Sequence, residues 1–308
     1  MRVGIDFGGT SIKIGLVEDD FNIAARFKVP TLTERGVHGM MEDTARGVLD
    51  MLRGAHVSME DIDSIGMGIP GGVDNVTGVV YMAANLGLKN APVREILSKI
   101  LGRSVFVAND ADSAVYGELI AGAAKGSTSA VLVTLGTGVG SGIIINSEIY
   151  NGAYHCGAEI GHMVIERAGR PCTCGRRGCF EAYCSASGII NMTRDAALAD
   201  SGSLLNSYGE ITGATAFDAA KKGDTAAKRV VEEFIDCLGT GLINIANIFQ
   251  PEVLMVGGGV SHEGEYILEP IRKSMTELVH SRFSDRQTKL CMAALGNDAG
   301  IIGAAFLK

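Results

Sequence analysis

Residues 2–17 read RVGIDFGGTSIKIGLV and carry the most informative pattern in the chain. Residues 3–7 form an apolar run with the length of a buried strand, and residues 12–17 form a second one. Gly8-Gly9-Thr10 lies between the two runs, so the stretch is predicted to be a β-hairpin. A glycine turn lets backbone N–H groups approach phosphate oxygens without a Cβ in the way. An ordinary hairpin turn with no ligand is the alternative.

The same pattern returns about one domain later in the chain. Residues 130–135 are predicted to form a strand, Gly136-Thr137-Gly138-Val139-Gly140-Ser141-Gly142 a turn, and residues 143–145 a second strand. The glycine spacing resembles a dinucleotide fingerprint, but such a fingerprint must open a helix. Ile143-Ile144-Ile145 favours a strand instead, so a dinucleotide-binding fold is rejected. The echo indicates two related halves, each with a phosphate hairpin.

Strands and helices alternate along the whole chain, which predicts the α/β class. The length of 308 residues favours about two domains. We expect a smaller domain over residues 1–115 plus 295–308 and a larger one over residues 116–294. The helices expected between the strands cover residues 33–55, 93–101, 113–124, 225–249 and 301–307, and the further strands cover residues 64–69, 105–108 and 253–256.

Composition excludes several classes of protein. Lysine and arginine number 27 against 35 aspartates and glutamates, a net charge of −8, which argues against nucleic acid as a partner. There is no run of about 18 apolar residues, so no membrane span is expected. The N-terminus places Asp6 where a signal peptide needs an apolar stretch, which favours a cytoplasmic protein.

Cysteines cluster in one segment of the chain. Cys172, Cys174 and Cys179 follow His162, and one imidazole with three thiolates makes a closed tetrahedral zinc set with no open position. Such a zinc is structural and would fix a loop that carries Glu159 and Glu181. A zinc ribbon for nucleic acid is the alternative, but it needs two separate cysteine pairs and a basic surface. Cys156, Cys184, Cys237 and Cys291 are expected to be small buried thiols, with Cys184 a possible substitute ligand.

Two further patterns place polar or glycine residues directly after strands. Asn109-Asp110 follows residues 105–108, and ligands of α/β proteins lie at the carboxyl ends of strands. An ionised aspartate there can accept a proton from a substrate hydroxyl, although either residue could simply cap the next helix. Gly257-Gly258-Gly259 follows residues 253–256 and suits the nucleoside part of a nucleotide, or merely a tight turn. Asp6 is placed to hold Mg²⁺.

These motifs together resemble the ROK family of sugar kinases, and within it the bacterial glucokinases. The resemblance runs over essentially the whole chain, and its most specific part is the segment from Glu159 to Glu181. It implies two ribonuclease-H-like domains of the actin/hexokinase type around a central cleft, with a zinc-binding loop. It also implies ATP-dependent phosphorylation of a hexose at the 6-hydroxyl. Glucose is the expected substrate, while N-acetylmannosamine, N-acetylglucosamine, fructose and allose stay open.

The resemblance also implies roles for individual residues. Asp110 would be the catalytic base, and His162 would bind zinc through one ring nitrogen and the sugar through the other. Members of the family usually form dimers or tetramers. The hexose site would comprise Gly71, Asn85, Asn109, Asp110, Glu159, His162 and Glu181; ATP and transient Mg²⁺ would use Asp6, Gly8, Gly9, Thr10, Lys13, Gly136, Thr137, Gly138, Gly258 and Gly259; structural Zn²⁺ would use His162, Cys172, Cys174 and Cys179.

Two alternatives come from other classes of protein. A sugar-responsive transcription regulator would carry a helix-turn-helix before the first hairpin, whereas five residues precede Asp6 here. An actin-like or chaperone ATPase would lack the cysteine segment and the Asn109-Asp110 pair.

Two positions depart from the family pattern: Cys156 stands where a small residue is common, and Cys184 where alanine is common. Either could alter sensitivity to oxidation.

Overall fold

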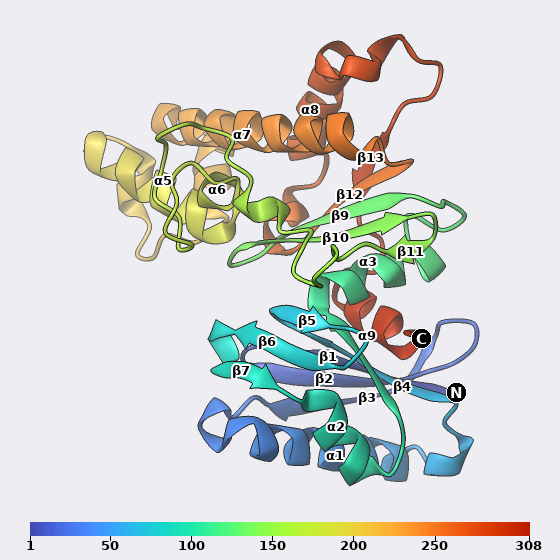
Figure 1. Cartoon of the computed structure of the whole chain (residues 1–308). Helices are drawn as coiled ribbons and strands as arrows, with labels where there is room; N and C mark the ends of the chain where they lie inside the picture. The colour runs from blue at the N-terminus through green and yellow to red at the C-terminus, as the bar shows by residue number, and fades with distance from the viewer. The chain divides into compact units, whose positions relative to one another are not determined.

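The computed structural model describes residues 1–308 and divides into two compact units. The first unit comprises Met1–Ala130, Gly142–Ala158 and Ala293–Lys308; the second comprises Val131–Ser141 and Glu159–Met292. Figure 1 shows strands and helices in both, so the predicted α/β class is confirmed. No helix combines the length and the apolar character that crossing a bilayer requires.

The first unit contains a five-stranded sheet that begins with the predicted hairpin. The sheet order is β3 (Ile23–Pro30), β2 (Ser11–Val17), β1 (Arg2–Phe7), β4 (Ser64–Ile69) and β8 (Val105–Asn109). β1 pairs with β2 antiparallel and with β4 parallel, and β4 pairs with β8 parallel.

Two kinds of residue along β1, buried apolar side chains and a glycine, allow helices to pack on this sheet. Val3, Ile5 and Phe7 alternate along β1 and are fully buried in a core shared with α1 (Gly36–Gly54) and α2 (Val93–Leu101). Gly4 lies between them, and a Cβ there would lie 1.9 Å from the carbonyl oxygen of Ile301 in α9 (Ala299–Ala305). Glycine therefore lets α9 pack directly on the strand backbone. α3 (Asp110–Ala121) packs against α9.

A second small sheet in the first unit holds candidate site residues. It has the order β5 (Gly72–Asp74), β6 (Val79–Ala83) and β7 (Leu88–Ala91), all antiparallel. The 3₁₀ turn η3 (Ala84–Leu86) joins β6 to β7 and contains Asn85.

The other five-stranded sheet repeats the order of the first, strand for strand. Its order is β11 (Glu148–Ile149), β10 (Val139–Ile145), β9 (Ala130–Leu135), β12 (Val253–Gly257) and β13 (Lys289–Met292). In each sheet three strands that are consecutive in the chain lie side by side: β1 to β3 in the first sheet and β9 to β11 in the second. Two later strands, β4 and β8 or β12 and β13, complete the other edge of the sheet. This shared order explains the echo in the sequence.

The remaining helices belong to the second unit. The longest is α7 (Thr225–Phe249). Asp224 caps its N-terminus by accepting a hydrogen bond from the N–H of Ala227 at 2.7 Å, and Gln250, which precedes Pro251, caps its C-terminus. The others are α4 (Glu181–Cys184), α5 (Ala186–Ala199), α6 (Thr215–Lys221) and α8 (Glu265–Leu278), with 3₁₀ turns η4 (Ile160–His162) and η6 (Gly259–Glu263).

Several predicted boundaries were wrong. The helix expected at residues 33–55 begins with a 3₁₀ turn, and α1 starts at Gly36. The helix expected from residue 113 starts at Asp110, because Asn109 caps it. The strand expected at residues 143–145 starts at Val139, since alternating small residues continue the pairing. Further elements that were not predicted from the sequence are β3, β5 to β7, β11, α4, α5, α6, α8 and β13.

Candidate functional site

The first glycine hairpin has a tightly tied backbone and an exposed tip. Gly8 N–H donates to the carbonyl of Ser11 at 3.0 Å, and the hydroxyl of Thr31 donates to the carbonyl of Gly8 at 2.7 Å. Gly9 and Thr10 are exposed. A Cβ on Gly9 would lie 3.4 Å from Nδ2 of Asn85, so this predicted hexose residue lies beside the hairpin. The backbone of the tip is therefore open to solvent.

Opposite charges face each other across this hairpin. Asp6 and Lys13 are directly paired between β1 and β2, and Nζ of Lys13 lies 3.0 Å from Oδ2 of Asp6. Both side chains keep some contact with solvent. The carboxylate offers the hard oxygen that Mg²⁺ prefers, and the ammonium offers a positive charge for phosphate.

The Asn109-Asp110 pair lies where β8 ends and α3 begins. Oδ1 of Asn109 accepts hydrogen bonds from the N–H of Ala111 at 2.8 Å and from the N–H of Asp112 at 3.3 Å. Asn109 therefore caps the N-terminus of α3. Its Nδ2 donates to the carbonyl of Gly71 at 3.0 Å. The structure thus brings Asn109, Asp110 and Gly71 together within the first unit.

Asp110 occupies the first position of α3. Its Oδ1 accepts from the N–H of Ala111 at 3.0 Å, and the side chain is partly exposed. The N-terminus of a helix favours the ionised carboxylate, which is the form that can accept a proton.

The second hairpin is held by the start of α4 and α5. The N–H of Val139 donates to Oε2 of Glu181 at 3.0 Å, and the N–H of Ala186 donates to the carbonyl of Gly136 at 2.8 Å. The hydroxyl of Ser187 donates to the carbonyl of Thr137 at 2.9 Å. Glu181, predicted to bind a sugar, therefore also shapes the second glycine hairpin, a role that was not predicted from the sequence.

Glu159 and His162 are fixed against β10 within the second unit. The N–H of Ile160 donates to Oγ of Ser141 at 3.2 Å, and a Cβ on Gly161 would lie 2.2 Å from the carbonyl oxygen of Val139. Burial raises the pKa of Glu159; nearby His162 lowers it, and Glu181 raises it further. The two carboxylates and the imidazole are therefore close enough to interact.

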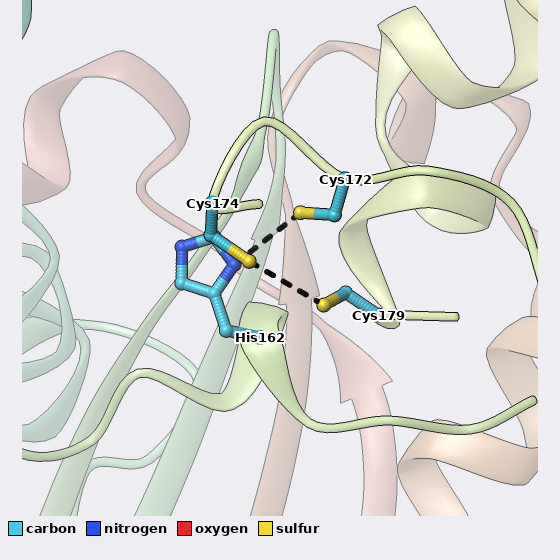
Figure 2. Close-up of side chains that lie close together, drawn as sticks. All are labelled: His162, Cys172, Cys174 and Cys179. Carbon is cyan, nitrogen blue, oxygen red and sulfur yellow. Dashed lines mark hydrogen bonds between the residues drawn. The ribbon is translucent and has the colours of Figure 1, made fainter. Parts of the chain in front are cut away.

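The predicted metal ligands converge. The ligand atoms of His162, Cys172, Cys174 and Cys179 all lie within 4.8 Å of one another (Figure 2). Sγ of Cys174 lies 3.7 Å from Sγ of Cys179, and Sγ of Cys172 lies 3.7 Å from Nδ1 of His162. Tetrahedral zinc with Zn–S bonds of about 2.3 Å needs about 3.8 Å between sulfurs and about 3.6 Å between sulfur and nitrogen. The donor set fits zinc, and Nε2 of His162 stays outside it.

Glycines make the tight turn around these ligands possible. Gly175 and Gly178 adopt φ values of 87° and 76°, and a Cβ on Gly178 would lie 1.7 Å from the carbonyl oxygen of Glu166. Cys184 is fully buried outside the cluster. The expectation of a buried thiol is confirmed for Cys184, whereas Cys237 and Cys291 are only half-buried. It was wrong for Cys156, which is exposed because it lies in the loop at residues 151–158.

The third glycine motif follows β12. Gly258 has φ 88°, and a Cβ there would lie 2.6 Å from the backbone nitrogen of Leu135, so this residue is required for packing. Gly259 is exposed with open space around it, and Nδ1 of His262 lies 2.7 Å from its carbonyl oxygen. Both predicted nucleoside residues, Gly258 and Gly259, are exposed, and the side of Gly258 that would carry a Cβ is filled by Leu135.

The chain is similar to known proteins both in sequence and in fold. The ROK family model matches residues 2–308. The glucokinase of Halalkalibacterium halodurans is 36% identical over 99% of this chain and 94% of its own, and that of Thermotoga maritima is 34% identical over 98% and 95%. The structure of a ROK family glucokinase from Streptomyces griseus in complex with glucose and AMPPNP superimposes with a TM-score of 0.81 and 33% identity, over 99% of this chain and 97% of that one. With a family match over nearly its full length, the chain belongs to the ROK family.

Proposed function

We propose that this protein is an ATP-dependent hexose kinase that phosphorylates the 6-hydroxyl of glucose. The observation that carries the proposal is the likeness, over almost the whole of both chains, to the Streptomyces griseus enzyme solved with glucose and AMPPNP. Curated relatives of matching length are glucokinases as well. The local geometry at Asn109-Asp110 and at the hairpins agrees with that chemistry.

Asp110 is the proposed base. The oxygen of the sugar hydroxyl attacks the γ-phosphorus of ATP, its proton passes to the Asp110 carboxylate, and the bond to the β–γ bridging oxygen breaks to release ADP. Phosphoryl transfer depends on positioning and charge neutralisation more than on covalent catalysis. Asn109 orients the start of α3 through its cap, so it serves both the base and the proposed sugar contacts.

Each glycine hairpin, and Asp6 beside the first, is proposed to bind phosphate groups or their metal ion. The exposed backbone of Gly9 and Thr10, with Lys13, would bind phosphate oxygens, and Gly136, Thr137 and Gly138 would do so in the second hairpin. Mg²⁺ would be held by Asp6 and would neutralise the charge of the leaving group. Gly259 would lie against the nucleoside.

Zinc has a structural role in this proposal. His162, Cys172, Cys174 and Cys179 would bind it, and the closed set leaves no position for a reacting water. By fixing η4 and the start of α4, the metal would orient Glu159, His162 and Glu181 toward sugar hydroxyls. Cysteines that form no disulfide, and the use of ATP, both fit the reducing cytoplasm as the proposed location. We also propose a homodimer or homotetramer, which light scattering after gel filtration would establish.

A coupled assay of ADP release tests the function. ATP is supplied with glucose, N-acetylglucosamine, N-acetylmannosamine, fructose or allose, and without sugar. We expect the highest kcat/KM with glucose and little ADP release without sugar. A faster reaction with an N-acetylhexosamine would reassign the substrate, and sugar-independent ATP turnover would refute the kinase proposal in favour of an ATPase.

A further inference from the structure

A carboxylate and an imidazole face each other in the first unit, outside the groups assigned above. Oδ1 of Asp74, at the end of β5, accepts from the N–H of Val76 at 2.9 Å and of Thr77 at 3.1 Å, and its Oδ2 accepts from the hydroxyl of Tyr81 at 3.1 Å. Nε2 of His155 lies 3.7 Å from Oδ1 of Asp74, with side chains 25% and 13% exposed. Asp74 is thus held by its own turn and presents a fixed anchor to His155.

His155 belongs to a loop that is closed at its base. The N–H of Gly157 donates to the carbonyl of Asn151 at 2.8 Å. His155 has φ 57°, in the left-handed region, and its Nδ1 is buried without a hydrogen-bond partner. Both features are unfavourable, and residues held in this way cluster at functional sites. The other ring nitrogen, Nε2, is the one that faces Asp74.

The next residue ties this loop to the candidate hexose residues. A Cβ on Gly72 would lie 2.7 Å from Sγ of Cys156, so the thiol lies directly on the Gly72 backbone. Gly71 precedes it and accepts the hydrogen bond from Asn109. The loop is therefore fastened to β5 at Gly72 and at Asp74, immediately beside the carbonyl that orients Asn109, and the chain then continues into Glu159.

We propose that His155 is a positioning residue for hexose binding. By docking on Asp74 it places Cys156 against Gly72, and so fixes the Gly71 carbonyl that holds Asn109. The inference rests on the proposed hexose-kinase function. It predicts an effect on the sugar and little effect on ATP, because none of these contacts involves the glycine hairpins.

The test uses substitutions at neighbouring loop positions. His155→Asn tolerates the left-handed backbone but is too short to reach Asp74. His155→Gln restores an amide near the position of Nε2. Tyr154→Ala is the matched control, because Tyr154 is 86% exposed on the same loop. Glucose binding is measured by calorimetry without ATP, together with kcat, KM for glucose, KM for ATP, zinc content and Tm.

We expect His155→Asn to raise the Kd and KM for glucose about fivefold to twentyfold, with KM for ATP and zinc content within twofold of the wild type. His155→Gln should recover most of the loss, and Tyr154→Ala should match the wild type. A His155→Asn protein that behaves like Tyr154→Ala would overturn the inference alone. The inference would also be overturned if His155→Gln bound glucose no better than His155→Asn. The same holds if His155→Asn raised the KM for glucose and the KM for ATP in parallel and lowered the Tm. A wild type without hexose-dependent ADP release would refute the proposed function itself.

Discussion

Glu181 at the start of α4 accepts a hydrogen bond from the backbone N–H of Val139 in the second glycine hairpin, at 3.0 Å. Its other oxygen lies 3.4 Å from the hydroxyl of Thr173 and 3.8 Å from Sγ of Cys172. One carboxylate therefore connects the hairpin to the cysteine segment. Glu181, which is proposed to bind sugar, is thereby coupled to the second glycine hairpin, which is proposed to bind phosphate.

The first prediction concerns that coupling. Glu181→Ala removes the acceptor for Val139, and a hydrogen bond to a charged group contributes about 1.5–3 kcal/mol. We expect KM to rise tenfold or more for ATP as well as for glucose, while Glu181→Gln, which keeps an acceptor oxygen, has a smaller effect on KM for ATP. Steady-state kinetics with each substrate varied in turn measures both values. An unchanged KM for ATP in Glu181→Ala would disprove the coupling.

The second prediction tests the space around the hairpin. A Cβ on Gly138 would lie 2.3 Å from Oε2 of Glu181, so Gly138→Ala must displace the carboxylate. Gly209→Ala is the matched control, because no atom lies within 4 Å of its Cβ position. We expect Gly138→Ala to lower kcat/KM at least tenfold and Gly209→Ala to leave it within twofold. Equal activity of the two variants would show that the close approach is unimportant.

The third prediction isolates the base. Asp110→Asn keeps the size of the side chain and the N-terminal position on α3 but cannot take a proton. We expect kcat to fall by about 10²–10⁴, which is the usual contribution of general base catalysis, with the Kd for glucose within threefold of the wild type. Calorimetry and the ADP-release assay separate the two quantities. Near-normal kcat would remove Asp110 from the proposed role.

The fourth prediction concerns the metal. We expect one zinc per chain by elemental analysis, and its loss in Cys174→Ser, because three donors hold zinc far less well than four. The Tm should fall, since metal binding free energy contributes to folding. Cys156→Ser, which changes a thiol outside the cluster, should keep the zinc. Wild-type protein that is active and free of metal would contradict the structural role.

The fifth prediction follows from the pKa of Asp74. Burial raises this pKa, but hydrogen bonds from Thr77, Val76 and Tyr81 outweigh burial and lower it from 3.8 to about 2. A depressed folded-state pKa stabilises the protein above the unfolded value, and that stability is lost as pH falls toward about 2. We expect Asp74→Asn to lower the free energy of unfolding by about 1–3 kcal/mol at pH 5 to 7.

The pH dependence distinguishes a charge effect from a packing effect at Asp74. The difference between wild type and Asp74→Asn, measured by urea unfolding, should be constant from pH 7 to 5 and shrink below about pH 4. A difference that stays constant down to pH 2.5 would show that the ionised carboxylate makes no special contribution.

Much of the site could be predicted from the sequence because its signals are local. The cysteine and histidine spacing predicted four ligand atoms that the structure places within 4.8 Å. The prediction for Asn109-Asp110 left open a cap or a catalytic pair, and Asn109 is the cap while Asp110 opens the helix. Cys156 was expected to be buried, but its exposure depends on how a loop folds back on β5, which no local pattern encodes.

The α/β class, the two hairpins and the members of the His/Cys cluster follow from the sequence alone, because strand period, glycine turns and ligand spacing act over a few neighbouring residues. Three contacts follow only from the folded chain: Glu181 accepts from Val139, Gly4 admits α9, and His155 faces Asp74. Each of these contacts joins residues 40 or more positions apart in the chain, and their pairing is set by how whole strands and helices pack.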